Sequence, residues 1–217
     1  MPLMGKSLLM NWSSVAPADR AEYYEWHVRE HMPGRVRVAG FARGRRYIAA
    51  RAERDFFQFY ELADRAVLSS PQYLAVANNP SALTRRVNPS VRNSVRIVAD
   101  VASSLGSGEG RFLATFRVSA AAGERERLGR CLMDEVLPRA IAMPEIVGAH
   151  LSRPGGQEGQ KGGAGDPDWV VMLEGISREA LEAASAVVLS ARGAEVGAAC
   201  EIFCHEFTLA KGDLAER

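Results

Sequence analysis

Residues 30–41 read EHMPGRVRVAGF and residues 135–149 read EVLPRAIAMPEIVGA, and the two stretches share one pattern. In each, a glutamate is followed three residues later by a proline, and a short apolar run around a glycine comes after it. Local similarity at matching places in the two halves of a chain is the mark of an internal repeat. The match therefore predicts a duplicated module.

Outward from this match, both halves show the same order of elements. The patterns of apolar and polar residues predict strands at 6–12, 40–49, 55–62 and 93–101 and helices at 17–32 and 69–78. The second half has expected strands at 111–119, 146–152, 169–174 and 201–209 and helices at 123–142 and 177–192. Each half reads strand, helix, strand, strand, helix, strand, which is the order of a ferredoxin-like unit. We predict an α+β fold of two tandem ferredoxin-like units.

Two segments rich in glycine and serine divide the chain. Residues 103–110 are expected to link a first repeat at 1–102 to a second repeat at 111–217. Residues 154–167 contain six glycines among charged and amide side chains. Such a stretch buries too little apolar area to order itself, so a flexible surface loop is expected there.

The composition is that of an ordinary globular protein, with 217 residues, 27 basic and 26 acidic side chains and a formal net charge of +1. A basic stripe that would bind nucleic acid or an anionic membrane is not expected. A signal peptide and a membrane-spanning segment are not expected. Its three cysteines, an odd number, favour a reducing, cytoplasmic compartment over a disulfide framework. The expected partners are a small-molecule ligand and a second copy of the chain in a homodimer.

A ferredoxin-like sheet has both helices on one face, so its other face must be buried against another sheet. The sequence resembles the dimeric α/β-barrel superfamily, and residues 23–33 followed by 40–47 are similar to the pattern of EthD-like and NIPSNAP-like members. The resemblance implies antiparallel sheets packed as a barrel around a ligand cavity. The superfamily includes cofactor-independent monooxygenases, isomerases, dehydratases and haem enzymes, so the resemblance does not select a reaction.

The first candidate catalytic residue is His31. On a helical wheel His31 lies inside the apolar stripe that faces the sheet, His27 lies at the edge of that stripe, and Trp26 points the opposite way, toward solvent. Pro33 is expected to end the helix. His31 is either a structurally satisfied core histidine or a general acid/base. Val136 occupies the matching position, so any such site is confined to the first half.

Strand faces supply the other candidates. Alternation places Arg43, Arg45 and Tyr47 on one face together with Phe41 and toward the barrel interior, where a guanidinium suits an oxygen anion. Polar residues also interleave with aromatic ones at Gln58 and Tyr60, and at Asn11. The alternative is that the arginines are solvated at a sheet edge and Tyr60 is a core tyrosine with a bonded hydroxyl.

No metal or cofactor is expected. Residues 27–31 match an inverted zinc-protease pattern formally, but they lack a third ligand and a scaffold of sufficient size. Cys200 and Cys204 fall on one strand face and His205 on the other, so the three cannot converge on one ion. His150 and His205 are conceivable axial haem ligands by resemblance to chlorite-dismutase-like relatives, although no motif marks either residue. A phosphate loop and a dinucleotide fingerprint are both missing.

The sequence therefore favours a cofactor-independent enzyme acting on a small organic molecule, for which an aromatic compound is one option. His31 would move a proton, and Arg45, Tyr47 and Tyr60 would orient or stabilise an oxygen anion. The substrate would be bound by Asn11, His27, Arg43, Tyr47 and Gln58. The alternative is a binding or assembly protein of the same fold that performs no catalysis.

Overall fold

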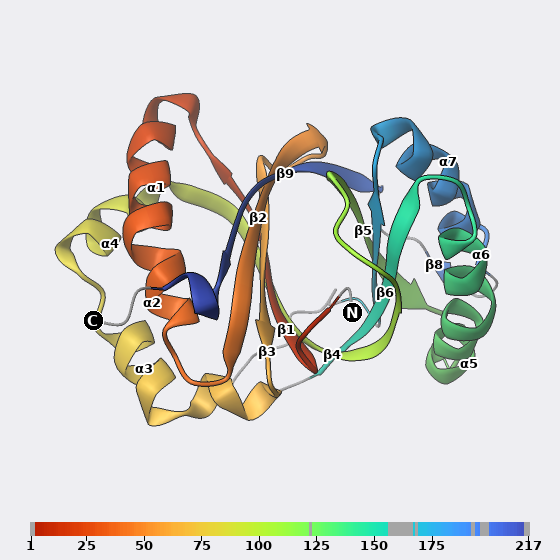
Figure 1. Ribbon diagram of the computed structural model, residues 1–217, viewed down its shortest axis with the longest axis horizontal. Coiled ribbons are helices and arrows are strands. Elements are labelled where there is room, and N and C mark those ends of the chain that lie inside the picture. Colours follow the sequence, from red (N-terminus) through yellow and green to blue (C-terminus); the bar gives the residue numbers. More distant parts are fainter. Residues whose placement is uncertain are drawn as a thin grey trace. The chain divides into compact units, whose positions relative to one another are not determined.

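A computed structural model describes residues 3–121, 123–155, 167, 169–191, 194–195 and 200–214 (Figure 1). Two compact units are present. The first-half unit comprises Met4–Ile48, Arg54–Val98 and Glu206–Arg217, and the second-half unit comprises Met1–Leu3, Ala49–Glu53 and Ala99–His205. No helix in the described part of the chain is both long and apolar enough to cross a membrane.

The first-half unit contains the strands β1 (Ser7–Val15) and β3 (Phe56–Leu62), β2 (Phe41–Arg51) up to Ile48, and β4 (Val91–Gly106) up to Val98. Strand β3 pairs antiparallel with β1 on one side and with β2 on the other. Its helical segments are η1 (Pro17–Asp19), α1 (Arg20–Trp26), η2 (His27–His31), α2 (Met32–Val36), η3 (Arg65–Ser69), α3 (Pro71–Asn78), α4 (Ala82–Val87), η4 (Asn88–Ser90) and η6 (Lys211–Asp213). Helices α1 to α4 gather on one side of this unit's strands (Figure 1).

The second-half unit contains β5 (Phe112–Ala120), β6 (Ile146–Pro154), β7 (Trp169–Gly175) and β8 (Ala194–Glu195). It also contains β9 (Glu201–Ala210) up to His205. Strand β7 pairs antiparallel with β5 and β6, and β5 also pairs with β9 and β8. The helical segments are α5 (Arg125–Cys131), η5 (Leu132–Val136), α6 (Leu137–Ile141) and α7 (Arg178–Leu189). The α+β class with antiparallel strands is therefore confirmed.

Both units bury the apolar residues that the strand and helix patterns indicated. In the second-half unit the core joins one face of β5, β6 and β7 to α5, α6 and α7. In the first-half unit one cluster lies around Phe41, Tyr60 and Tyr73 and another around Tyr23 and Phe56. Burial of this apolar area is the main favourable contribution to folding.

The first helix does not end at Pro33, so that prediction was wrong, whereas the helix expected at 123–142 does run past Pro138. Segments η2 and η5 are π-helical turns, and Pro33 and Pro138 stand at the start of the α-helices that follow. A proline inside an α-helix has no N–H to donate and its ring clashes with the carbonyl four residues earlier. The wider π turn in front of each proline relieves that clash, and the helices continue to Val36 and Ile141.

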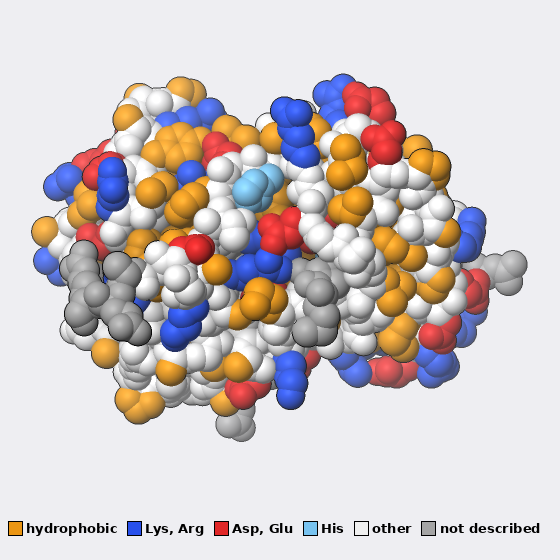
Figure 2. Space-filling model, in the orientation of Figure 1, with side chains coloured by type: hydrophobic (Ala, Val, Ile, Leu, Met, Phe, Trp, Pro, Cys, Tyr) orange, Lys and Arg blue, Asp and Glu red, His pale blue; other side chains and the backbone are white. Residues whose placement is uncertain are grey.

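Two segments, residues 103–110 and 154–167, were expected to be irregular. Strand β4 extends to Gly106, so residues 103–106 of the expected linker are strand. The predicted glycine-rich loop at 154–167 lies outside the described residues, apart from 154, 155 and 167. Charged side chains of both signs are interspersed on the visible face of the molecule (Figure 2), in keeping with the formal net charge of +1.

Candidate functional site

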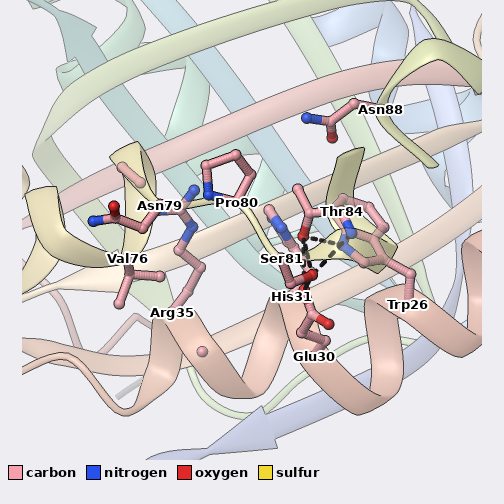
Figure 3. Close-up of a pocket in the computed structure, with 12 residues that line it drawn as sticks. Trp26, Glu30, His31, Arg35, Val76, Asn79, Pro80, Ser81, Thr84 and Asn88 are labelled. Atoms are coloured by element: carbon pink, nitrogen blue, oxygen red, sulfur yellow. Dashed lines mark hydrogen bonds between the residues drawn. The ribbon is translucent and has the colours of Figure 1, made fainter. Parts of the chain in front are cut away.

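A pocket of about 540 Å³ opens in the first-half unit between the helix at residues 20–36 and the segment from the end of α3 to α4 (Figure 3). This volume is typical of sites for small organic ligands. Its lining residues are Trp26, Glu30, His31, Gly34, Arg35, Val76, Ala77, Asn79, Pro80, Ser81, Thr84 and Asn88. The pocket thus combines an aromatic wall, aliphatic groups, one histidine and one charge of each sign.

A chain of hydrogen bonds forms one wall of the pocket. The indole Nε1 of Trp26 donates to Thr84 Oγ1 at 2.9 Å, and Thr84 Oγ1 donates to Glu30 Oε1 at 2.7 Å. Ser81 Oγ also donates to Glu30 Oε1 and accepts the backbone N–H of Thr84, which caps α4. Trp26 is only 4% exposed, so the expectation that it faces solvent was wrong.

His31 stands in the pocket beside this wall. Its ring centroid lies 4.3 Å from that of Trp26, 5.4 Å from that of His27 and 6.4 Å from that of Tyr60. Removal of the ring from water, and then the positive charge of Arg35, lower the pKa of His31 to about 3. The imidazole is therefore neutral at pH 7 and offers one donor and one acceptor nitrogen.

His27 is the more deeply buried histidine, with no exposed surface. Its Nδ1 lies 3.1 Å from Nη1 of Arg46, whose guanidinium also bonds Glu206 at 3.0 Å. Burial, the neighbouring His31 and Arg46 hold the pKa of His27 well below its usual value. The helical wheel placed His31 inside the apolar stripe and His27 at its edge, whereas in the structure His27 is fully buried and His31 lines the pocket. The wheel assumed regular α-helical rotation through a segment that is π-helical.

Three of the predicted residues lie on the sheet face that carries the helices. Tyr60 is paired with Gly44 and Leu9, and Gln58 with Arg46 and Asn11, in the strand register. Desolvation raises the pKa of the buried Tyr60 hydroxyl, which has no hydrogen-bond partner among the described residues. Asn11 accepts a hydrogen bond from Ser94 at 2.8 Å. None of the three lines the pocket.

Arg43, Arg45 and Tyr47 lie on the opposite face of the same sheet. The two guanidinium groups pair with the fully buried carboxylate of Glu61, and Arg45 Nη1 also donates to the Tyr47 hydroxyl at 3.1 Å. A bulge between residues 41 and 43 separates Phe41 from this face and places it in the core with Tyr60, which corrects the expected alternation. The expected grouping of Arg45 with His31 and Tyr60 is therefore not found.

Sequence reasoning missed Arg35, Arg46, Glu30 and Thr84. Arg35 lies with its guanidinium carbon 4.8 Å from the ring centre of Tyr73, and its buried Nη1 has no hydrogen-bond partner among the described residues. A cation four residues after His31 on a helix was the one available signal for Arg35. Thr84 gave no signal, because α4 has only six residues and is too short to show helical periodicity.

The second-half unit gives no support to a haem or metal site in its described residues. Both ring nitrogens of His150 have protein partners, Ser104 Oγ at 3.0 Å and Glu174 Oε1 at 3.2 Å, so His150 does not fit the role of an axial ligand. Cys200 lies 3.0 Å from the hydroxyl of Ser185. Within the described ranges, no group of three or more His, Cys, Asp or Glu side chains could hold a metal ion.

The chain matches no family model and no curated protein. Among solved structures it is similar to an anthrone oxidase-like protein, with a TM-score of 0.72 and 13% identity over 100% of this chain and 99% of that one. A protein from Lactobacillus acidophilus whose name proposes a monooxygenase gives a TM-score of 0.60 at 9% identity, over 94% of this chain and 96% of that one. A chlorite dismutase variant from Candidatus Nitrospira defluvii, in complex with cyanide, gives 0.62 at 9% identity, over 94% and 92%. At these identities the likeness shows the fold alone: this chain shares an α+β fold with these proteins.

Proposed function

We propose that this chain is an enzyme that acts, without a cofactor, on a small organic molecule bound in the pocket beside His31. One observation carries the proposal: a pocket of about 540 Å³ is lined by a neutral imidazole together with Trp26 and the two charged groups Glu30 and Arg35. Apolar walls with a few polar groups are the usual composition of a small-molecule site. The names of two structural neighbours, an oxidase-like protein and a monooxygenase, support an enzyme of this fold.

His31 is the proton acceptor in this proposal. Its lowered pKa keeps the ring in the accepting form at neutral pH. Tyr60 lies behind His31 and helps to fix the ring, while Arg35 takes the role in the pocket that the sequence had suggested for Arg45. The buried charge network around Glu61 includes Arg43, Arg45 and Tyr47. On the sheet face that carries the helices, Asn11 pairs with Gln58 across the strands, and His27 contacts Arg46 from the helix.

A second candidate is a binding protein without turnover, and the same histidine favours it. A base whose pKa lies near 3 accepts a proton weakly, and efficient general bases have a pKa close to the working pH. The pocket would then hold its ligand through Trp26 and Arg35 without chemistry at His31.

One experiment separates the two candidates. Aromatic acids, phenols and ketones are screened for a rise in melting temperature, and each binder is incubated with wild type and with His31→Gln while product is followed by mass spectrometry. For an enzyme we expect product from wild type and at least ~100-fold less from His31→Gln at equal ligand occupancy. Binding without product in wild type supports the second candidate. Equal turnover by both proteins would remove His31 from the mechanism.

The family resemblance and the repeat organisation of the chain are also proposals. We propose that the chain is EthD-like, with two ferredoxin-like repeats at 1–102 and 111–217 whose sheets pack as a barrel. The matching π turns before Pro33 and Pro138, and the matching bulges at the starts of β2 and β6, support a duplication. The assigned repeats follow the order of elements along the chain and differ from the two compact units, in which the last strand is divided.

Partners and location are proposed on charge and thiol chemistry. The near-zero net charge supports a small-molecule partner over nucleic acid. The cysteines Cys131, Cys200 and Cys204 are free, which supports a reducing, cytoplasmic compartment. Homodimer formation is proposed as well, and light scattering after size-exclusion chromatography tests it: a mass near 23.6 kDa would show a monomer instead.

A further inference from the structure

The proposed function leaves the chemical class of the ligand open, and the charges of the pocket bear on that class. Arg35 and Glu30 are the two charged side chains in the lining. Glu30 is engaged by two hydroxyl groups, those of Ser81 and Thr84, which donate to its Oε1. Among the described residues, Arg35 has no ion pair, and its buried Nη1 donates no hydrogen bond. The Glu30 carboxylate therefore has hydrogen-bond partners in the protein, and the buried Nη1 of Arg35 has none among the described residues.

The other arginines nearby each have a carboxylate partner. Arg43 and Arg45 both form ion pairs with Glu61, and Arg46 forms one with Glu206. Arg35 lines the pocket without a carboxylate partner among the described residues, so its counter-charge is expected from a ligand in the pocket. Tyr73 holds the Arg35 guanidinium from one side by ring stacking at 4.8 Å, which orients its N–H groups before a ligand arrives.

The potential inside the pocket agrees with this assignment. Arg35 is the charged side chain that acts on His31, and it disfavours the protonated ring. A positive potential that disfavours a cation at His31 favours an anion placed at the same point. His31 itself is neutral and brings no charge of its own, but its ring can form one hydrogen bond to an oxygen of the ligand.

The rest of the lining fits a flat, apolar body. Trp26 presents an indole ring that its hydrogen bond to Thr84 holds in place, and Val76, Ala77 and Pro80 form the aliphatic part of the wall (Figure 3). Aromatic rings stack on such surfaces in offset or edge-to-face geometry. A ring with one oxyanion would fill the aromatic and the cationic parts of the pocket together.

We propose that this pocket binds an aromatic oxyanion, with the charged oxygen on the Arg35 guanidinium, the ring along Trp26 and Pro80, and His31 as a neutral hydrogen-bond partner. This inference rests on the proposed function for the location of the ligand and adds its charge and class. It gives Arg35 the largest share of the discrimination between an anion and its neutral isostere.

The test compares 1-naphthoate with its neutral isostere 1-naphthamide by calorimetry. Three tryptophans give three indole N–H signals in NMR, and the signal of Trp26 reports whether the probe occupies this pocket. The variant is Arg35→Gln. The matched control is Arg37→Gln, which removes the same charge two residues further along, from an exposed side chain outside the pocket lining. Arg35→Lys keeps the charge and controls for loss of the fold.

We expect naphthoate to bind wild type at least ~10-fold more tightly than naphthamide, since a hydrogen bond to a charged group is stronger than one between neutral groups. Arg35→Gln should remove this preference, Arg37→Gln should leave it unchanged, and Arg35→Lys should keep part of it. Equal binding of both probes, or equal effects of the two glutamine variants, would overturn the anion assignment while the pocket itself stands. If neither probe moved the Trp26 signal at millimolar concentration, both the assignment and the proposed function would fail.

Discussion

Nη1 of Arg46 lies 3.1 Å from Nδ1 of His27 in the fully buried space between helix and sheet. An arginine only donates hydrogen bonds, so Nδ1 must accept and the single ring proton resides on Nε2. Protonation of Nδ1 would place a donor against a donor and a second positive charge beside the guanidinium. The contact therefore fixes both the tautomer and the charge of His27.

The stability of the protein should fall as the pH drops below about 6.5, the usual pKa of histidine. Below that pH the unfolded chain protonates His27 and His31, while the folded chain, with a lowered pKa at both, does not. The unfolded state then binds more protons, so acid favours it by about 1.4 kcal/mol per pH unit for the buried His27. Urea unfolding between pH 7.5 and pH 4.5 measures the slope, and His27→Gln should make it shallower. An unchanged slope in that variant would show that His27 titrates normally in the folded protein.

Gly44→Ala should destabilise the sheet under the helix. A Cβ at residue 44 would lie 2.8 Å from two ring carbons of Tyr60 and 3.1 Å from Met32 Cγ. Overpacking of this kind costs about 1–3 kcal/mol. Gly34→Ala is the matched control, because its Cβ would meet only Val76 at 3.8 Å and alanine is the better helix former. Thermal unfolding of both variants decides the matter, and an equal or higher melting temperature for Gly44→Ala would contradict the packing described.

Thr84→Val should loosen the pocket wall while keeping the shape of the side chain. The valine cannot accept from Trp26 Nε1 and cannot donate to Glu30, so a buried donor and a carboxylate oxygen each lose a partner. We expect a loss of about 1–3 kcal/mol in unfolding free energy and a shift of the Trp26 indole signal. Thr84→Ser keeps the hydroxyl and should behave like wild type. Similar losses in both variants would assign the effect to the methyl group instead.

Glu61→Gln should be strongly destabilising. The Glu61 carboxylate is fully buried, pairs with Arg43 and Arg45, and accepts the backbone N–H groups of Met4 and Gly5. Its neutralisation removes the negative charge that Glu61 supplies to two buried cations, and breaking a buried ion pair typically costs about 3–5 kcal/mol. The control Glu25→Gln breaks the exposed pair with Arg29 and should change the unfolding free energy by less than ~0.5 kcal/mol. Denaturant unfolding of both variants would refute this ranking if the two losses were alike.

The elements of the fold were predictable from the sequence, and the site was predictable only in part. Strand and helix positions follow from local alternation and from caps such as Ser70 and Ser177, which act within a few residues. His31 was identified as a candidate because it lies on a helix with a clear apolar pattern. The direction of its side chain was not predicted, since a helical wheel assumes α-helical rotation and residues 27–31 form a π turn.

The remaining site residues depend on contacts between segments distant in sequence. Thr84 meets Trp26 and Glu30 across more than fifty residues, and no local pattern encodes that approach. The arginines of β2 illustrate a second limit: alternation separated Arg43 and Arg45 from Arg46 correctly, but it could not show which acidic side chain each of them meets. Glu61, the counter-charge of the first two, lies on the neighbouring strand.

Pro33 contributes no hydrogen bond to the pocket, yet it governs which histidine a ligand can reach. Because its ring excludes a regular turn before it, every side chain from residue 27 to residue 31 is swung around the helix axis, and His31 instead of His27 emerges beside Trp26. A residue that lacks an amide hydrogen and crowds the turn before it thus helps to select which imidazole lines the pocket.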